Sequence, residues 1–368
     1  MQRRRRRIAL LVLILVFAMA GVLFSKVLTS SRTAPKSAVA VPVHYWVGIA
    51  RCTFFDSARS TLNYLNNTTK KGRLLITEVR YPTLSPTKGL SETPDAHPAL
   101  RHGPFPMVVF GHGYALTPDT YAKLLDHWVE AGFVVVAPLF PDTSEGSVAN
   151  ISVANSFLPE ADDINQPGDM AFVTKEMLNS SGATSLLCPI AHGLISRTKI
   201  ALAGQSDGAT TAVALGYDPK YRVASLQYRA VIDLSGELFG AGTLTPDVLS
   251  VTRRSPALFV SQSATDTCNP PQFSLAIYNG VHMNRKWFLK IAAAHHLPPY
   301  IGTAVRAFNA VATTTTMFLR DEFDGVAPGR ALLKLGNAHP SVASLSTGHN
   351  PPAIAPLTQG PGSCYLTS

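Results

Sequence analysis

The sequence has little charge and contains no internal repeat or long low-complexity run. Charged residues make up 15% of its 368 residues and hydrophobic residues 46%, an ordinary balance for a globular protein. The missing repeat gives no support for a solenoid or similar array. The length is ample for one sizeable core and permits one to three domains.

Acidic residues are absent from residues 1–40, which contain eight basic ones. Residues 41–368 therefore carry only +1 of the formal net charge of +9. The basic charge belongs mainly to the N-terminal segment. It gives little support for nucleic-acid binding, which requires a basic patch on the folded domain.

The N-terminal segment has the composition of an export sequence. Five arginines, Arg3–Arg7, precede the uncharged apolar run 8–24. A basic start and a short apolar core are typical of a signal peptide, and the run also reaches the low end for a membrane-spanning helix. We expect residues 1–24 to be a cleaved signal peptide or a retained membrane anchor. Residues 25–40 are then a linker, and residues 41–368 are a domain outside the cytoplasmic membrane.

Cysteines are few, and none form a CxxC pair, which leaves little support for a zinc site. Cys52, Cys188, Cys268 and Cys364 all lie beyond the export segment. An even number of cysteines in an exported chain predicts one or two disulfides. Three full pairings are possible, and free buried cysteines are the alternative.

Short apolar runs alternate with helix-like segments along the remaining chain. Continuous apolar runs separated by amphipathic helices predict an α/β fold, with a mostly parallel sheet covered by helices on both faces. Strands are expected at 74–82, 105–113, 133–138, 199–204, 230–236, 257–263 and 286–292, and helices at 121–132, 169–178, 209–215 and 304–319.

Residues 204–208 read GQSDG and match the short pattern GxSxG. The context is more specific than the pattern, because KIALA before it reads as a strand and ATTAVAL after it as a helix. A serine on such a strand-to-helix turn is the arrangement of a nucleophile. This predicts Ser206 as the nucleophile, with Gly204 and Gly208 permitting close approach of strand and helix. The alternative is a glycine-rich turn in which Ser206 only caps the helix.

A nucleophilic serine needs a base and a carboxylate that orients the base. On this kind of turn they follow in the order Ser, Asp or Glu, His, each after a later strand. Asp266 follows a predicted strand and is the predicted acid, with Asp233 at the end of the preceding strand as the alternative. His295 and His296 follow the next strand, and either can be the base.

The tetrahedral intermediate of acyl transfer needs hydrogen-bond donors for its oxyanion. The backbone N–H groups of Tyr114 and Asp207 are the predicted donors, and His112 is interpreted as a residue that shapes the loop before Tyr114. Asp207 opens a predicted helix, where a carboxylate is favoured. Its side chain is expected to face outward or to be hydrogen-bonded. This chemistry requires no metal and no organic cofactor.

These motifs resemble those of serine esterases of the α/β-hydrolase superfamily. More narrowly, the sequence is similar to secreted bacterial esterases related to dienelactone hydrolases, platelet-activating-factor acetylhydrolases and cutinases. The resemblance covers roughly residues 45–325 and implies one catalytic domain with a sheet of about eight strands. The histidine loop AAAHHLPPY selects His296, because the family's histidine precedes an apolar residue and then proline. Stretches that carry the resemblance are FFDSARSTLNYLNNTTKKGRLLITEVRYPT, PFPMVVFGHGYALTPDTYAKLLDHWVEAGFVVVAP and KIALAGQSDGATTAV.

The resemblance implies an exported serine esterase that forms an acyl-enzyme and cleaves a small-molecule or lipid ester. A lipase or phospholipid-cleaving hydrolase at the membrane is one alternative, and an inactive binding protein with this fold is another. Two residues depart from the family's pattern. Gln205 stands where His is frequent, and Asp207 stands where Met or Leu is frequent.

Overall fold

The computed structural model describes residues 43–63, 66–86, 89, 91–149, 161–182, 188–237, 246–325, 329–358 and 364. The predicted export segment and linker, residues 1–40, lie outside these described residues. No helix among the described residues is both long and apolar enough to cross a membrane.

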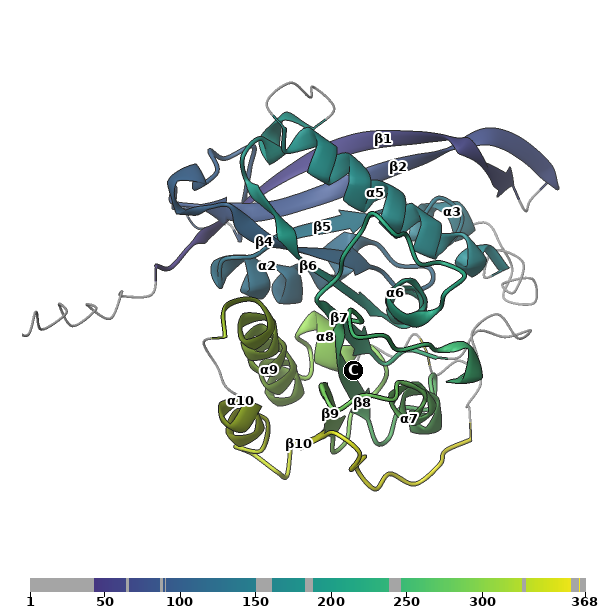
Figure 1. The fold of residues 1–368 in the computed structure, drawn as a ribbon, viewed down its shortest axis with the longest axis vertical. Coiled ribbons are helices and arrows are strands. Elements are labelled where there is room, and N and C mark those ends of the chain that lie inside the picture. The colour runs from purple at the N-terminus through teal and green to yellow at the C-terminus, as the bar shows by residue number, and fades with distance from the viewer. Residues whose placement is uncertain are drawn as a thin grey trace, which may run out of the picture. The chain divides into compact units, whose positions relative to one another are not determined.

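One sheet of ten strands forms the centre of the molecule (Figure 1). Its strand order is β10-β9-β8-β7-β6-β4-β5-β2-β1-β3. The strands from β9 to β5 in this order run parallel, while β10 and β2 pair antiparallel at the two ends of the parallel part. The strands are β1 (Trp46–Asn63), β2 (Thr68–Thr83), β3 (Glu92–Pro94), β4 (Phe105–Gly111), β5 (Val134–Pro138), β6 (Ile195–Gln205), β7 (Ala230–Leu234), β8 (Ala257–Ser263), β9 (Lys286–Ile291) and β10 (Ala343–Thr347).

The predicted fold class is confirmed, but the predicted count of about eight strands is wrong. The two additional strands, β3 and β10, lie at opposite edges of the sheet. β3 has only three residues, and β10 reads ASLST, which has no continuous apolar run. An edge strand is not buried on both faces, so the pattern used to find the central strands does not reveal it.

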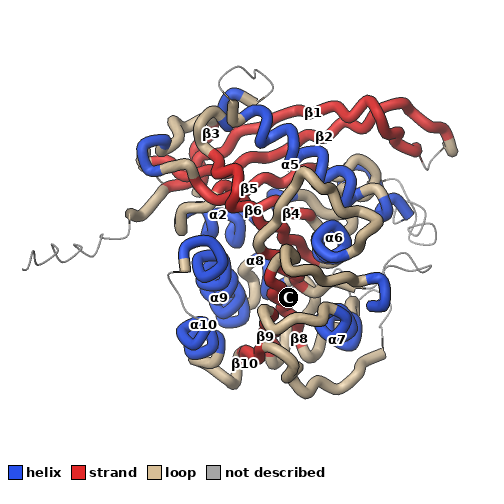
Figure 2. Tube along the Cα trace, viewed as in Figure 1, coloured by secondary structure: helices blue, strands red, loops and turns tan. Residues whose placement is uncertain are grey.

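Helices cover both faces of the sheet (Figure 2). The layers follow from strand geometry, because successive strand residues point to opposite faces. Met107 and Val109 of β4 contribute to one core and Val108 and Phe110 to the other. The helices are α2 (Ala122–Glu130), α3 (Glu145–Val148), α5 (Gln166–Ser180), α6 (Asp207–Tyr217), α7 (Pro271–Gly280), α8 (Pro298–Ile301), α9 (Val305–Asp324) and α10 (Gly329–Gly336).

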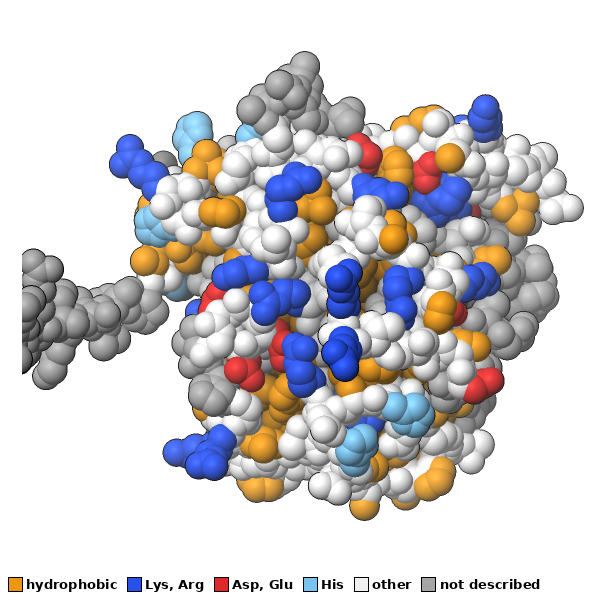
Figure 3. All heavy atoms as spheres, viewed as in Figure 1, with side chains coloured by type: hydrophobic (Ala, Val, Ile, Leu, Met, Phe, Trp, Pro, Cys, Tyr) orange, Lys and Arg blue, Asp and Glu red, His pale blue; other side chains and the backbone are white. Residues whose placement is uncertain are grey.

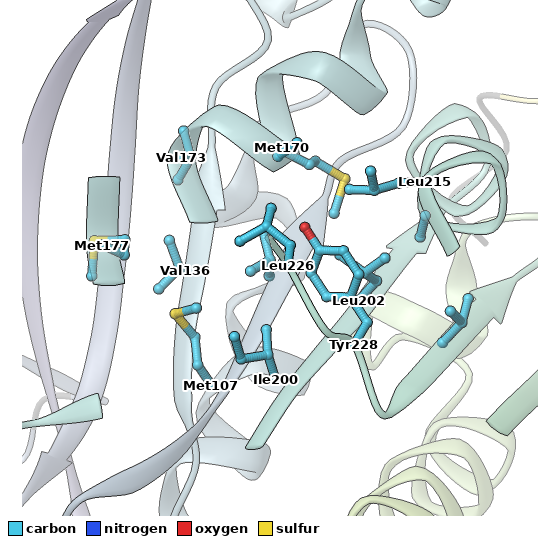
Figure 4. Packing of buried hydrophobic residues seen from close by; sticks show 14 of the residues in the cluster. Met107, Val136, Met170, Val173, Met177, Ile200, Leu202, Leu215, Leu226 and Tyr228 are labelled. Atoms are coloured by element: carbon cyan, nitrogen blue, oxygen red, sulfur yellow. The ribbon is translucent and has the colours of Figure 1, made fainter. Parts of the chain in front are cut away.

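One core lies between the sheet and α5 (Figure 4). Met170 and Val173 of α5 face Val136, Ile200 and Leu202 of the strands, and all five are fully buried. Burying a side chain of this size stabilises the folded state by about 1.5–3 kcal/mol. This packing fixes the central strands, whose carboxyl ends carry the predicted site residues.

All four cysteines are paired. Cys52 in β1 bonds to Cys188, and Cys268, after β8, bonds to Cys364 near the C-terminus. The structure thus selects one of the three possible pairings, and the free-cysteine alternative is wrong. The second bridge joins the C-terminal region to the loop that carries Asp266.

Candidate active site

Ser206 lies on the turn between β6 and α6, as the sequence predicts. Its backbone has φ 54° and ψ −125°, a region that non-glycine residues rarely adopt. A Cβ on Gly204 would lie 2.1 Å from the carbonyl oxygen of Gly208, and a Cβ on Gly208 would lie 2.1 Å from that of Gly111. Glycine at both positions therefore lets β6, α6 and β4 meet backbone to backbone, with Ser206 at the junction.

Ser206 lines a cavity of about 180 Å³. Three other predicted site residues, Tyr114, Asp207 and His296, line the same cavity. Among the residues that the structure describes, no group of three or more His, Cys, Asp or Glu side chains is arranged to hold a metal ion. The arrangement therefore offers a hydroxyl, an imidazole and backbone amides around one small space.

Asp266 and His296 are brought together from the loops after β8 and β9. The Nδ1 atom of His296 lies 2.8 Å from Oδ2 of Asp266, and both side chains are buried. His295 is exposed instead. Asp233 accepts the backbone N–H of Gly236 at 2.7 Å and stabilises a turn. Asp266 and His296 thus form the pair, and the two alternatives, Asp233 and His295, take no part in it.

The carboxylate of Asp266 is held by donors on both oxygens. Ser235 Oγ and Gln262 Nε2 donate to Oδ2 at 2.5 and 3.2 Å, and the backbone N–H groups of Cys268 and Asn269 donate to Oδ1 at 2.9 and 3.1 Å. Burial by itself raises the pKa of Asp266, but His296 and these donors outweigh burial and hold the pKa below its usual value. Asp266 therefore stays ionised and can stabilise an imidazolium.

The other ring nitrogen of His296 contacts Gln205, which sequence reasoning did not place in the site. Nε2 of Gln205 lies 2.9 Å from Nε2 of His296. Oε1 of Gln205 accepts the hydroxyl of Tyr121 at 2.6 Å, and that hydroxyl oxygen accepts the N–H of Gly113 at 3.1 Å. An amide nitrogen only donates, so Gln205 is placed to hold the ring of His296 at this nitrogen. The departure of Gln205 from the family's pattern was the sequence signal for this role.

The hydroxyl of Ser206 has a different neighbour. Nδ2 of Asn269 lies 3.4 Å from Ser206 Oγ and donates to the carbonyl of Ser235 at 2.8 Å. The serine and the histidine thus line one cavity, while a separate amide holds each of them. A proton transfer between them requires the imidazole to exchange the Gln205 amide for the Ser206 hydroxyl.

We predict that replacing Gln205 with leucine raises kcat for p-nitrophenyl acetate by up to about tenfold, because the imidazole no longer has to give up a hydrogen bond of roughly 1.5 kcal/mol or less before it takes the Ser206 proton. KM should change less than kcat. Steady-state kinetics test this, with Gln272→Leu as the control. Gln272 bonds to Leu357, away from the cavity. A rate that falls in Gln205→Leu would mean that the amide holds the ring in its productive position instead of competing with Ser206 for the base.

The two predicted oxyanion donors come from different segments of the chain and line the same cavity. Asp207 directly follows Ser206 in the chain. Tyr114 follows the end of β4, on a loop fixed by the N–H of Ala115 to the carbonyl of Thr143 at 2.8 Å. The side chain of Asp207 is only 4% exposed. Of the two expected arrangements, the outward-facing one is therefore wrong, while the hydrogen-bonded one stays a prediction; Asp207 lines the cavity.

His112 shapes the loop before Tyr114, in keeping with its interpretation from the sequence. Its Nδ1 contacts the carbonyl of Gly113 at 2.8 Å, and its Nε2 accepts the backbone N–H of Phe140 at 3.0 Å. Burial lowers the pKa of His112 to about 4, although the bond to Gly113 opposes this. His112 is therefore a neutral link between the loops after β4 and β5.

We predict that this burial makes the protein less stable in mild acid. The unfolded chain protonates His112 near pH 6.5, whereas the folded chain does so only near pH 4. The stability of the folded state is thus lost as the pH falls through this window, by about 3 kcal/mol. Urea unfolding at several pH values measures it. The His112→Asn variant should be less stable at pH 7 and show a shallower slope, and parallel curves would contradict the prediction.

Comparisons with known proteins bear on the fold and on the class of protein. A family model described as Chlorophyllase matches residues 80–261, just under half of the chain. The structure is similar to one described as ferulic acid esterase from Streptomyces cinnamoneus, with a TM-score of 0.60 and 17% sequence identity over 84% of this chain and 98% of that chain. No curated protein matches the sequence.

The chain is an α/β-hydrolase. The family model and the fold likeness together confirm the resemblance drawn from the sequence. The two matches support a carboxylic ester hydrolase as the class of this α/β-hydrolase.

Proposed function

We propose that this α/β-hydrolase is an exported serine esterase that uses Ser206, His296 and Asp266 through an acyl-enzyme. The observation that carries the proposal is the 2.8 Å contact between His296 and Asp266 beside the cavity that Ser206 lines. A serine hydroxyl is a weak nucleophile until a base takes its proton. His296 is the imidazole placed for this role.

The proposed reaction begins with an ester carbonyl in the cavity. Ser206 Oγ attacks the carbonyl carbon, and its proton passes to Nε2 of His296 as that atom leaves the Gln205 amide. Asp266 stabilises the imidazolium, and the N–H groups of Tyr114 and Asp207 stabilise the oxyanion. His296 returns the proton to the departing alcohol. Water, activated by the same imidazole, then hydrolyses the acyl group from Ser206.

The cavity favours a small acyl group. Its volume of about 180 Å³ is below the usual range for drug-sized ligands, and Leu116 and Leu297 contribute apolar walls. The names of the two matches, chlorophyllase and ferulic acid esterase, agree with a carboxylic ester as substrate. No specific feature of the described residues favours a lipase or a phospholipid-cleaving enzyme at the membrane.

Export is supported by the charge pattern and by the disulfides. Arg3–Arg7 precede an apolar run in the sequence, and the two bridges, Cys52–Cys188 and Cys268–Cys364, are of a kind that persists in oxidising compartments. We therefore propose that the enzyme acts outside the cytoplasmic membrane.

A fluorophosphonate probe tests the proposed nucleophile. The folded wild-type enzyme should be labelled, with the adduct on the peptide that contains Ser206, and Ser206→Ala should not be labelled. Hydrolysis of p-nitrophenyl esters of increasing chain length should favour the short acyl chains. If folded wild-type protein takes up no label, the protein is not a serine esterase and the inactive-binding alternative gains support.

A further inference from the structure

Four neighbouring strands of the sheet carry an arginine at or just before their amino ends. β6, β7, β8 and β9 lie side by side in that order and run parallel, so these ends meet at one edge of the sheet. The arginines are Arg197, Arg229, Arg254 and Arg285. Adjacent strands lie about 4.8 Å apart, so the row spans roughly 15 Å. Ser206 lies at the opposite end of these strands, directly after the carboxyl end of β6.

The row lines a hollow. A cavity of about 400 Å³ is lined by the four arginines and by Arg253. A second cavity of about 240 Å³ shares Arg254 with it and adds Arg222. Neither cavity has Asp or Glu among its lining residues. We call these two cavities, with their six arginines, the arginine groove.

Half of the six arginines contact uncharged partners. Arg197 donates to the carbonyl of Leu178 at 2.7 Å, and Arg222 donates to the carbonyl of Ser250 at 2.8 Å. The guanidinium carbon of Arg229 lies 5.9 Å from the centre of the Phe323 ring.

Carboxylates of α9 compensate part of the groove's charge, because Glu322 interacts electrostatically with both Arg285 and Arg229, and Asp321 interacts with Arg285. Within the described residues, Arg285 is the one member of the arginine groove that forms an ion pair, with Glu322. Figure 3 shows Lys and Arg side chains gathered across the middle of one face. The folded domain therefore has a concentrated positive surface despite its small net charge.

We propose that the arginine groove binds a linear polyanion, a chain of phosphate groups. A single phosphate cannot reach arginines spread over roughly 15 Å, whereas successive phosphates of a chain can pair with successive strands. The concave shape suits a chain that enters the groove better than a flat bilayer surface. Because Ser206 lies at the other edge of the sheet, a bound polyanion would leave the cavity of Ser206 open. The arginine groove would thus hold the enzyme on a polyanion while the cavity of Ser206 stays accessible to its substrate.

The test uses the full chain and end-labelled inorganic polyphosphate, with binding followed by fluorescence anisotropy. The affinity should fall as salt rises, with a slope of about −3 in log affinity against log salt for four phosphate contacts. Arg253→Gln/Arg254→Gln should weaken binding by about tenfold or more. No hydrogen bond or ion pair of the described residues engages these two guanidinium groups, so the change should not disturb the fold. Ester hydrolysis by this double variant at the wild-type rate checks that its fold is intact.

A matched double variant separates the groove from general charge. Arg101→Gln/Arg306→Gln removes the same charge from two exposed arginines outside the groove, and its affinity should stay within about twofold of the wild type. Absence of binding by the wild type at low salt, or equal weakening in both double variants, would overturn the proposal. So would binding to phosphatidylglycerol vesicles that depends on the groove while polyphosphate is ignored, because the occupant would then be a membrane surface.

Discussion

Replacing His296 with alanine should lower kcat for a p-nitrophenyl ester by at least about 10⁴-fold, while KM changes little. The reason is that, among the residues that the structure describes, His296 is the one imidazole that contacts Asp266, at 2.8 Å, and also lines the cavity of Ser206. Without it the serine has no group placed to take its proton. Steady-state kinetics measure the effect, and a fluorophosphonate probe should label the variant far more slowly than the wild type.

The neighbouring histidine supplies a matched control. His295 is exposed, so His295→Ala should keep kcat within about threefold of the wild type, as surface substitutions usually have small effects. If His295→Ala abolished turnover and His296→Ala did not, the register of the histidine loop would be wrong by one residue.

Replacing Gly208 with alanine should destabilise the fold by about 3 kcal/mol or more. The added Cβ would lie 2.1 Å from the carbonyl oxygen of Gly111, which is backbone of the central strand β4. A flexible side chain could move away from such a contact, but a strand buried in the middle of the sheet cannot. The free energy of unfolding in urea measures the effect, or the yield of folded protein if the variant does not accumulate.

Gly146 provides the comparison for this substitution. It is exposed on α3, and a Cβ there would meet nothing within 4 Å. Gly146→Ala should therefore be neutral or slightly stabilising, since alanine reduces the freedom of the unfolded chain. Equal stabilities of Gly208→Ala and Gly146→Ala would contradict the close approach of α6 and β4.

The sequence predicted the parts of the fold that are buried on both faces. β8 matches its expected range, and β5, β6 and β9 match within a few residues, because continuous apolar runs between helices are typical of strands inside a parallel sheet. The two edge strands escaped prediction because they are short or polar. The disulfide pairing escaped it because three pairings satisfy the same four cysteines.

The candidate site was predictable where chain order and local turn chemistry define it. Ser206, Asp266 and His296 follow three strands in the order that the fold requires. Gln205 could be noticed only as a departure, since its contact with His296 joins positions 91 residues apart. The proposed groove was hidden for a similar reason. Arg197, Arg229, Arg254 and Arg285 look isolated along the chain, and only the parallel order of the strands gathers them.

The bridge between Cys268 and Cys364 affects how the enzyme should be prepared. The backbone N–H of Cys268 donates to Asp266, so the oxidised pair braces the acid of the proposed triad. A host that makes the protein in a reducing cytoplasm would leave both thiols free. The resulting preparation could have the correct mass and helix content and still hydrolyse esters slowly. A thiol assay on each batch would separate an unformed bridge from a poorly chosen substrate.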